Sequence, residues 1–190
     1  MSRTIDFDKD EILDKAMNVF WTKGYEGTSM KDLMDATGLL KGSLYNTFES
    51  KENLFILCLE KYGHQSKSRH YRQGDPSEYL RSFFKRLVDQ GASKNFKKGC
   101  LIMNSCLEFA YDNSLLSKQA KRLFSATENN FKNVLEALID GAKSEEEVES
   151  IKIALVTAAF SIREISKFKK DKKFLTEIAN KALREISLSI

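Results

Sequence analysis

The 190-residue sequence contains a single proline and only nine glycines, so little in it interrupts helix formation. It has no apolar run near the roughly 18 residues that a membrane-spanning helix needs. The first residues, 1–15, are highly charged and contain no apolar signal core. Three cysteines, an odd number in apolar segments, argue against a disulfide framework. We therefore expect a soluble, cytoplasmic, helical protein without a membrane partner.

The net charge is +4, a mild basic bias that does not by itself indicate nucleic-acid binding. Residues 1–50 carry nine acidic and six basic side chains, so this segment is net acidic. Five of those acids lie between Asp6 and Asp14, at an expected helix start where the helix dipole favours them. Net charge alone therefore singles out no DNA-binding segment.

Start and stop signals divide the chain into about nine helices, with no convincing strand and no internal repeat. Asp8 with Glu11 begins the first helix, and Gly24 ends it. Asp75 and Pro76 begin another, which extends to about residue 90. The others are expected at about 29–38, 40–47, from 50 onward, and at 100–111, 114–141, 144–167 and 172–188. The sequence thus predicts an all-α fold, with an N-terminal three-helix module and a helical body.

Residues 29–48 have the layout of a helix-turn-helix, in which a glycine turn joins two short helices. Gly38 permits the tight turn, and the apolar contacts to a preceding helix come from Met30, Leu33, Leu44 and Phe48. The second helix exposes small or hydrogen-bonding groups that suit the major groove, namely Lys41, Gly42, Ser43, Tyr45, Asn46 and Thr47. We predict a DNA-binding domain at 1–49 and a ligand-binding and dimerisation domain at 50–190.

Several separate blocks in this region resemble the N-terminal module of TetR-type repressors. The blocks are Phe20 to Tyr25, Thr28-Ser29, Lys41 to Tyr45 with Phe48, and Ser50 to Glu52. They cover about a quarter of the chain and agree in both residue type and spacing. The resemblance implies a dimer that binds double-stranded DNA, an effector pocket in the C-terminal body, and release from DNA when the effector binds.

The resemblance also implies roles for individual residues. Thr28 and Ser29 would hold a phosphate at a helix N-terminus, and Lys51 would reach another phosphate. Lys41, Ser43, Tyr45 and Asn46 would touch bases or backbone. Leu40 departs from the pattern, because many relatives have a serine there and leucine cannot cap a helix. The sequence therefore leaves the first residue of the third helix undetermined by one position.

Aromatic, methionine and cysteine side chains are concentrated at 50–140, where we expect a site for a small apolar or aromatic effector. A metal site is not expected, because Cys58, His64 and His70 follow one another at a spacing of six residues, which turns each by about 120° around a helix. No cofactor motif is present either. From their helix faces, the predicted pocket residues are Tyr62, Phe83, Leu87, Met103, Leu107, Phe124 and Phe131.

Two apolar stripes near the C-terminus predict a homodimer, in which two helices from each subunit form a four-helix interface. The first stripe comprises Ile151, Leu155, Ala158, Ala159, Ile162 and Ile165, and the second Leu175, Ile178, Ala179, Ala182 and Ile186.

The alternative is a small helical enzyme that carries an N-terminal helix trio. It would need a nucleophile, an acid–base pair or a cofactor motif, and the sequence shows no such signature. We therefore predict a ligand-responsive repressor that is not an enzyme and that leaves a palindromic operator when it binds its effector.

Overall fold

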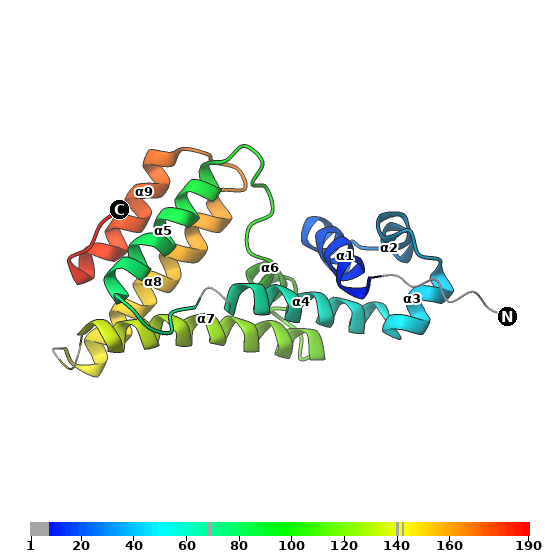
Figure 1. Cartoon of the computed structure of the whole chain (residues 1–190), viewed down its shortest axis with the longest axis horizontal. Helices are drawn as coiled ribbons and strands as arrows, with labels where there is room; N and C mark the ends of the chain where they lie inside the picture. Colours follow the sequence, from blue (N-terminus) through cyan, green and yellow to red (C-terminus); the bar gives the residue numbers. More distant parts are fainter. Residues whose placement is uncertain (1–7, 68–69, 140, 142) are drawn as a thin grey trace. The chain divides into compact units, whose positions relative to one another are not determined.

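A computed structural model describes residues 8–67, 70–139, 141 and 143–190, and in these ranges the chain forms nine α-helices and no strand (Figure 1). The helices are α1 (Lys9–Lys23), α2 (Met30–Thr37), α3 (Lys41–Phe48), α4 (Lys51–Lys67), α5 (Pro76–Ala92), α6 (Leu101–Glu108), α7 (Leu115–Ile139), α8 (Glu145–Ile165) and α9 (Lys172–Leu183), followed by the 3-10 turn η1 (Arg184–Ile186). The all-α prediction is confirmed.

The helices belong to two compact units. Unit 1 comprises Met1–Ser68 and Asn104–Lys121, and unit 2 comprises Arg69–Met103 and Arg122–Ile190. Unit 1 therefore contains α4, the end of α6 and the start of α7 as well as the three N-terminal helices. Packing thus divides the chain differently from the boundary predicted after residue 49, because α4 packs along α1.

In unit 1, α1 and α4 are joined by an apolar core and by ion pairs at its edge. Phe20 and Phe55 meet edge to face, with ring centroids 4.8 Å apart. Lys61 forms ion pairs with Asp10 and Asp14 at 2.9 and 2.8 Å. Partial burial would lower the pKa of Lys61, but its hydrogen bonds to the two carboxylates raise that pKa overall. Two of the N-terminal acids are therefore paired with one lysine of α4, which offsets half of their negative charge.

The helix α6 ends at Glu108, earlier than the predicted end at about residue 111. Phe109 is buried and packs against Tyr25 and Phe55, at centroid distances of 5.8 and 6.1 Å. Its carbonyl accepts a hydrogen bond from the hydroxyl of Ser117 at 3.1 Å. These contacts redirect the chain after Glu108, which a helix continuing to residue 111 would prevent.

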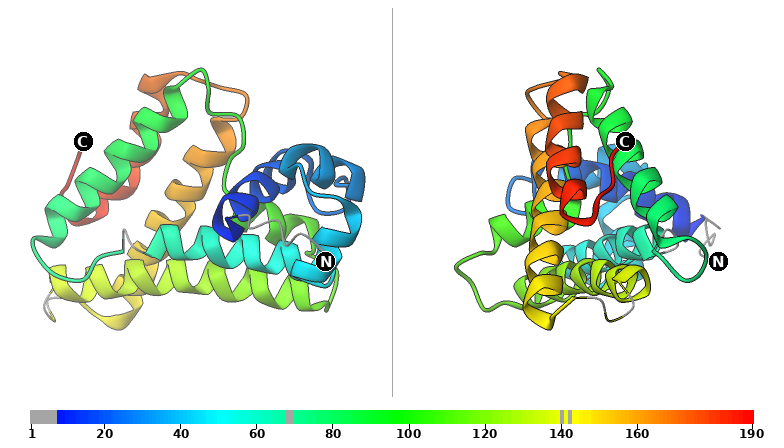
Figure 2. Two further views of the ribbon diagram at one scale, coloured as in Figure 1. Left: turned by 45° about the vertical axis from the view of Figure 1, so that its right-hand side comes forward. Right: turned by 90° about the vertical axis from the view of Figure 1, so that its left-hand side faces the viewer.

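In unit 2, α5, α8 and α9 lie side by side (Figure 2). Gly91 of α5 lies at a close approach, because a Cβ there would clash with the hydroxyl of Ser166. The helix α9 ends at Leu183, before the predicted end at about residue 188. The following chain folds back, and the N–H of Ile190 donates to the side-chain oxygen of Asn180 at 2.8 Å.

Cys58 and Cys100 are buried, whereas Cys106 is half-buried. Burial raises the pKa of the Cys58 thiol, which lies 3.5 Å from the carbonyl oxygen of Leu13. Its reactive thiolate form is therefore strongly disfavoured at neutral pH, which fits a packing role. Within the described ranges, no helix is long and apolar enough to cross a membrane.

Candidate functional site

The helices α2 and α3 form a helix-turn-helix around a left-handed glycine. Gly38 has φ of +75°, and its N–H donates to the carbonyl of Met34 at 2.9 Å. Leu44 and Phe48 are 2% and 1% exposed, so the inner face of α3 is anchored in the core of unit 1. The opposite face of α3 is thereby held in one orientation.

That opposite face carries polar side chains and no acid. Lys41, Tyr45 and Asn46 are exposed, and Ser43 and Thr47 are half-buried between them and the core. The ammonium of Lys41 lies 5.9 Å from the ring centroid of Tyr45. The structure thus brings the predicted base-contacting residues together on one accessible surface with hydrogen-bonding groups and a positive charge.

Two residues at the start of α3 reduce the stability of the helix without a packing reason in unit 1. Leu40 occupies the N-cap, makes no capping hydrogen bond and is 74% exposed. A serine there would stabilise the helix by about 1 kcal/mol. Gly42 does not have a positive φ, and a Cβ at this position would meet nothing within 4 Å. The open question about the helix start is also resolved, because α3 begins at Lys41.

The structure corrects the role expected for Thr28 and qualifies that of Ser29. Thr28 is 1% exposed, and its hydroxyl donates to the carbonyl of Gly24 at 2.5 Å, so its side chain is engaged inside unit 1 and does not offer its hydroxyl to a phosphate in this structure. Ser29 caps α2 reciprocally with Asp32. A hydrogen bond from Lys23 and further ones from Ser29 lower the pKa of Asp32. A phosphate at this helix start would therefore meet an ionised carboxylate.

Lys51, for which the sequence predicts a phosphate contact, is engaged within the protein in this structure. Its ammonium donates to the carbonyls of Tyr25 and Thr28, both at 2.9 Å. It also lies 4.2 Å from the ring centroid of Tyr25. Because two of its three N–H groups are used in this way, Lys51 ties the start of α4 to the connection between α1 and α2.

Sequence reasoning missed Glu108, which holds the same connection from another side. Its carboxylate accepts hydrogen bonds from the backbone N–H groups of Tyr25 and Glu26, at 3.1 and 2.8 Å. Gly24 leaves room for it, since a Cβ there would lie 3.0 Å from a carboxylate oxygen. The one available signal was electrostatic, because an acid in the last turn of a helix opposes the helix dipole.

Residues 12–58, which include the helix-turn-helix, match the family described as bacterial regulatory proteins, tetR family. The HTH-type transcriptional repressor ComR of Escherichia coli (strain K12) is 32% identical over 134 residues, which are 68% of this chain but only 64% of ComR. The uncharacterized HTH-type transcriptional regulator YezE of Bacillus subtilis (strain 168) is 32% identical over 134 residues, 66% of this chain and 69% of YezE. The chain belongs to the TetR family.

Solved TetR-family structures agree over nearly the whole chain. The TetR family transcriptional regulator CifR, as a cysteine mutant complexed with 26bp double-strand operator DNA, has a TM-score of 0.82 and 25% identity, covering 96% of this chain and 98% of CifR. The chain is thus a DNA-binding transcriptional regulator with the TetR fold. The matched family and these neighbours are transcriptional regulators, not enzymes.

The residues predicted to line an effector pocket of this TetR-family chain are divided between the two units. Phe83 and Phe131 pack together in unit 2, with centroids 5.3 Å apart, and Leu87 is buried in the same unit. Tyr62 belongs to unit 1, where it packs edge to face on Trp21. Others lie elsewhere: Met103 is half-buried in unit 2, Leu107 is 62% exposed in unit 1, and Phe124 of unit 2 stacks on Phe160.

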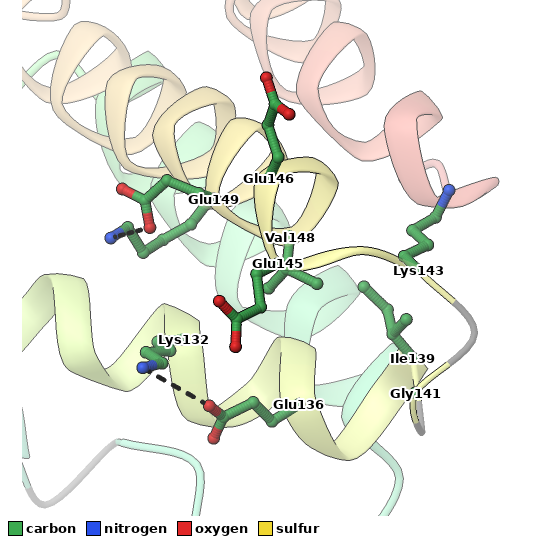
Figure 3. Close-up of a pocket in the computed structure, with 10 residues that line it drawn as sticks. Lys132, Glu136, Ile139, Gly141, Lys143, Glu145, Glu146, Val148 and Glu149 are labelled. Carbon is green, nitrogen blue, oxygen red and sulfur yellow. Dashed lines mark ion pairs between the residues drawn. The ribbon is translucent and has the colours of Figure 1, made fainter.

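A hollow of about 630 Å³ in unit 2 contains none of these predicted residues (Figure 3). It lies between the end of α7 and the start of α8, and its walls are mostly charged. Lys132 pairs with Glu136 at 3.8 Å, and Lys152 with Glu149 at 2.6 Å. A wall of paired charges does not suit the apolar effector that the sequence predicts.

The two stripes predicted to form the dimer interface lie mainly inside the protomer. Leu155, Ile162, Leu175 and Ala179 are fully buried where α5, α8 and α9 pack. Such residues have no free surface to offer a second subunit, which corrects their assignment. Ile151, Ala158, Ala159 and Ala182 are also buried but keep 5–6% of their surface exposed, whereas Ile165, Ile178 and Ile186 are half-buried.

We expect Lys51→Ala to destabilise the protein by about 1–3 kcal/mol, because it leaves the Tyr25 and Thr28 carbonyls without their charged donor. Urea unfolding followed by circular dichroism measures this. The matched control is Lys41→Ala, which removes an exposed lysine and should leave the unfolding free energy within about 0.5 kcal/mol of wild type. Equal stability of the two variants would contradict the role of Lys51.

We expect Glu108→Ala to speed hydrogen exchange at the backbone amides of Tyr25 and Glu26, because both lose their acceptor. Glu108→Gln retains a weaker acceptor and should give an intermediate rate. Exchange measured by NMR has an internal control in the amide of Gly24, which donates to the carbonyl of Phe20 at 2.8 Å. Unchanged exchange at residues 25 and 26 would show that Glu108 does not protect them in solution.

Proposed function

We propose that the chain is a repressor that binds a palindromic operator as a homodimer, with α3 in the major groove, and that a small apolar or aromatic effector releases it. The observation that carries the DNA-binding part is the start of α3. Leu40 and Gly42 lower helix stability there and gain nothing inside unit 1. Both residues are explained if an external partner comes close to this end of the helix.

The chemistry of the exposed face of α3 fits operator DNA. Gly42 lets a phosphate or base edge come close to the helix backbone. Lys41 supplies a positive charge, and Asn46 has the paired donor and acceptor that suit the N6 and N7 atoms of adenine. Tyr45 is 41% exposed and offers a ring and a hydroxyl. ComR is named as a repressor and CifR binds operator DNA, which supports the same use of this module here.

The effector is proposed to bind in unit 2, among the aromatic side chains of α5, α7 and α8. Phe83 with Phe131 and Phe124 with Phe160 form apolar clusters there. The helix α6 belongs to both units, with residues 101–103 in unit 2 and 104–108 in unit 1. Its last residue, Glu108, holds the α1–α2 connection. Release follows only if the effector prefers the state that does not bind DNA.

The dimer surface is proposed on the outer stripe of α8, which faces away from the buried stripe. Ile153 is 55% exposed, and its neighbours on this stripe are small or apolar, namely Ala154, Thr157, Ser161 and Ile165. Small side chains let two helices approach closely, and the apolar groups gain from burial. The half-buried Ile178 of α9 extends the surface to a second helix.

The DNA-binding part is tested with two variants of α3, on a duplex that the wild-type protein selects from a random library. Gly42→Ala should raise the melting temperature, because alanine favours the helix by up to about 1 kcal/mol, and yet weaken DNA binding. Asn46→Ala should relax preference at one base pair in each half-site, worth about 1–3 kcal/mol. Fluorescence anisotropy and thermal melting measure both effects.

Wild-type affinity in both variants would show that α3 does not enter the groove. The regulatory part has a separate outcome. If apolar aromatic compounds raise the melting temperature and none changes operator affinity, the proposed release mechanism is wrong.

Light scattering at micromolar concentration should give a dimer for the wild-type protein and a monomer for Ile153→Glu, because the variant places a charge in an apolar interface. Leu115→Glu is the matched control, since Leu115 is 58% exposed and lies in unit 1. It should remain a dimer. A dimeric Ile153→Glu protein would place the interface elsewhere.

A further inference from the structure

Leu40 lies at the end of α3 that a helix-turn-helix directs toward base edges. Its side chain is 74% exposed, more than that of Tyr45, which is 41% exposed on the same helix-turn-helix. An exposed leucine contributes no burial free energy to folding. At an N-cap it also takes the place of the polar residues whose side chains stabilise a helix start. The residue is thus unfavourable to the free protein on two separate grounds.

The neighbouring residues show why this apolar group is not simply part of the core. Leu39, one residue earlier, is 9% exposed and faces inward, and its N–H donates to the hydroxyl of Thr37 at 3.3 Å. Leu44, one turn later, is 2% exposed and anchors α3. The turn therefore holds Leu40 outward between two inward-facing leucines. Its carbonyl accepts the N–H of Leu44 at 3.1 Å, which fixes the residue to the first turn of the helix.

The edges of the base pairs in the major groove present one apolar group, the C5-methyl of thymine, among hydrogen-bond donors and acceptors. A leucine has neither donor nor acceptor in its side chain, so the only base feature that it recognises favourably is that methyl. We propose that Leu40 is a specificity-determining residue that contacts a thymine methyl in each half-site. This inference rests on the proposed function, because it requires α3 to lie in the groove.

The test replaces thymine by deoxyuridine, which lacks only the methyl, at one symmetric pair of positions at a time in the duplex selected by the wild-type chain. Wild-type affinity should fall about fourfold per half-site, or about fifteenfold for both, at one thymine position. On the thymine duplex, the affinity of Leu40→Ala should be lower than that of wild type by a similar factor. Replacing thymine by deoxyuridine at that position should not lower the affinity of this variant further. Leu40→Met keeps an apolar side chain of similar volume and should retain the sensitivity.

A fourth variant separates recognition from folding. Leu40→Ser supplies the missing cap, so its melting temperature should rise while its sensitivity to the thymine methyl disappears. The inference is overturned if replacing thymine by deoxyuridine lowers wild-type affinity at no position. It is also overturned if the replacement lowers the affinities of wild type and Leu40→Ala by the same factor at every position. If the wild-type chain selects no duplex at all, the proposed DNA-binding function fails, and this inference with it. Binding that depends on Asn46 but not on Leu40 refutes this inference alone.

Discussion

The presentation of α3 depends on how the connection between α1 and α2 is held. Residues 24–29 lie outside the helices, and local hydrogen bonds pair only some of their backbone groups. Two charged side chains from distant parts of the chain add further hydrogen bonds to this backbone. Lys51 donates to the carbonyls of Tyr25 and Thr28, and Glu108 accepts from the N–H groups of Tyr25 and Glu26. Charged partners form the stronger class of hydrogen bond. They fix the path of the chain into α2, and hence the orientation of the helix-turn-helix.

This arrangement also explains why the acidic composition of the N-terminal region does not oppose DNA binding. Asp10 and Asp14 pair with Lys61 of α4, and Asp32 pairs with Lys23 and caps α2. Because two lysines lie within ion-pair distance of these three carboxylates and offset two of their three charges, the field of these acids at the surface of α3 is reduced. A charge count over a segment ignores which partners the fold supplies from outside that segment.

The sequence predicted the parts of the site that depend on local pattern. The turn at Gly38, the anchors Leu44 and Phe48, and the accessible face of α3 follow from spacing within about twenty residues. The contacts of Glu108 span 82 and 83 residues, and no local rule gives them. The apolar stripe of α8 was read as a dimer surface for a related reason. Periodicity shows that a face is buried, but it does not show whether the same chain or a second one buries it.

The connection held by Glu108 is also suited to regulation. The helix α6 begins at Leu101, directly after Cys100, and ends at Glu108 in unit 1. The N–H of Cys100 donates to the carboxylate of Glu164 at 3.3 Å within unit 2. Allosteric coupling typically amounts to about 1–3 kcal/mol. The two hydrogen bonds to the carboxylate of Glu108 have a free energy in the same range. A hydrogen bond to a charged group contributes about 1.5–3 kcal/mol, and exposure to solvent reduces that contribution. In the release mechanism proposed above, the effector would therefore not need to unfold the helix-turn-helix. A shift of α6 that separated Glu108 from the amides of Tyr25 and Glu26 would free the connection that orients α3.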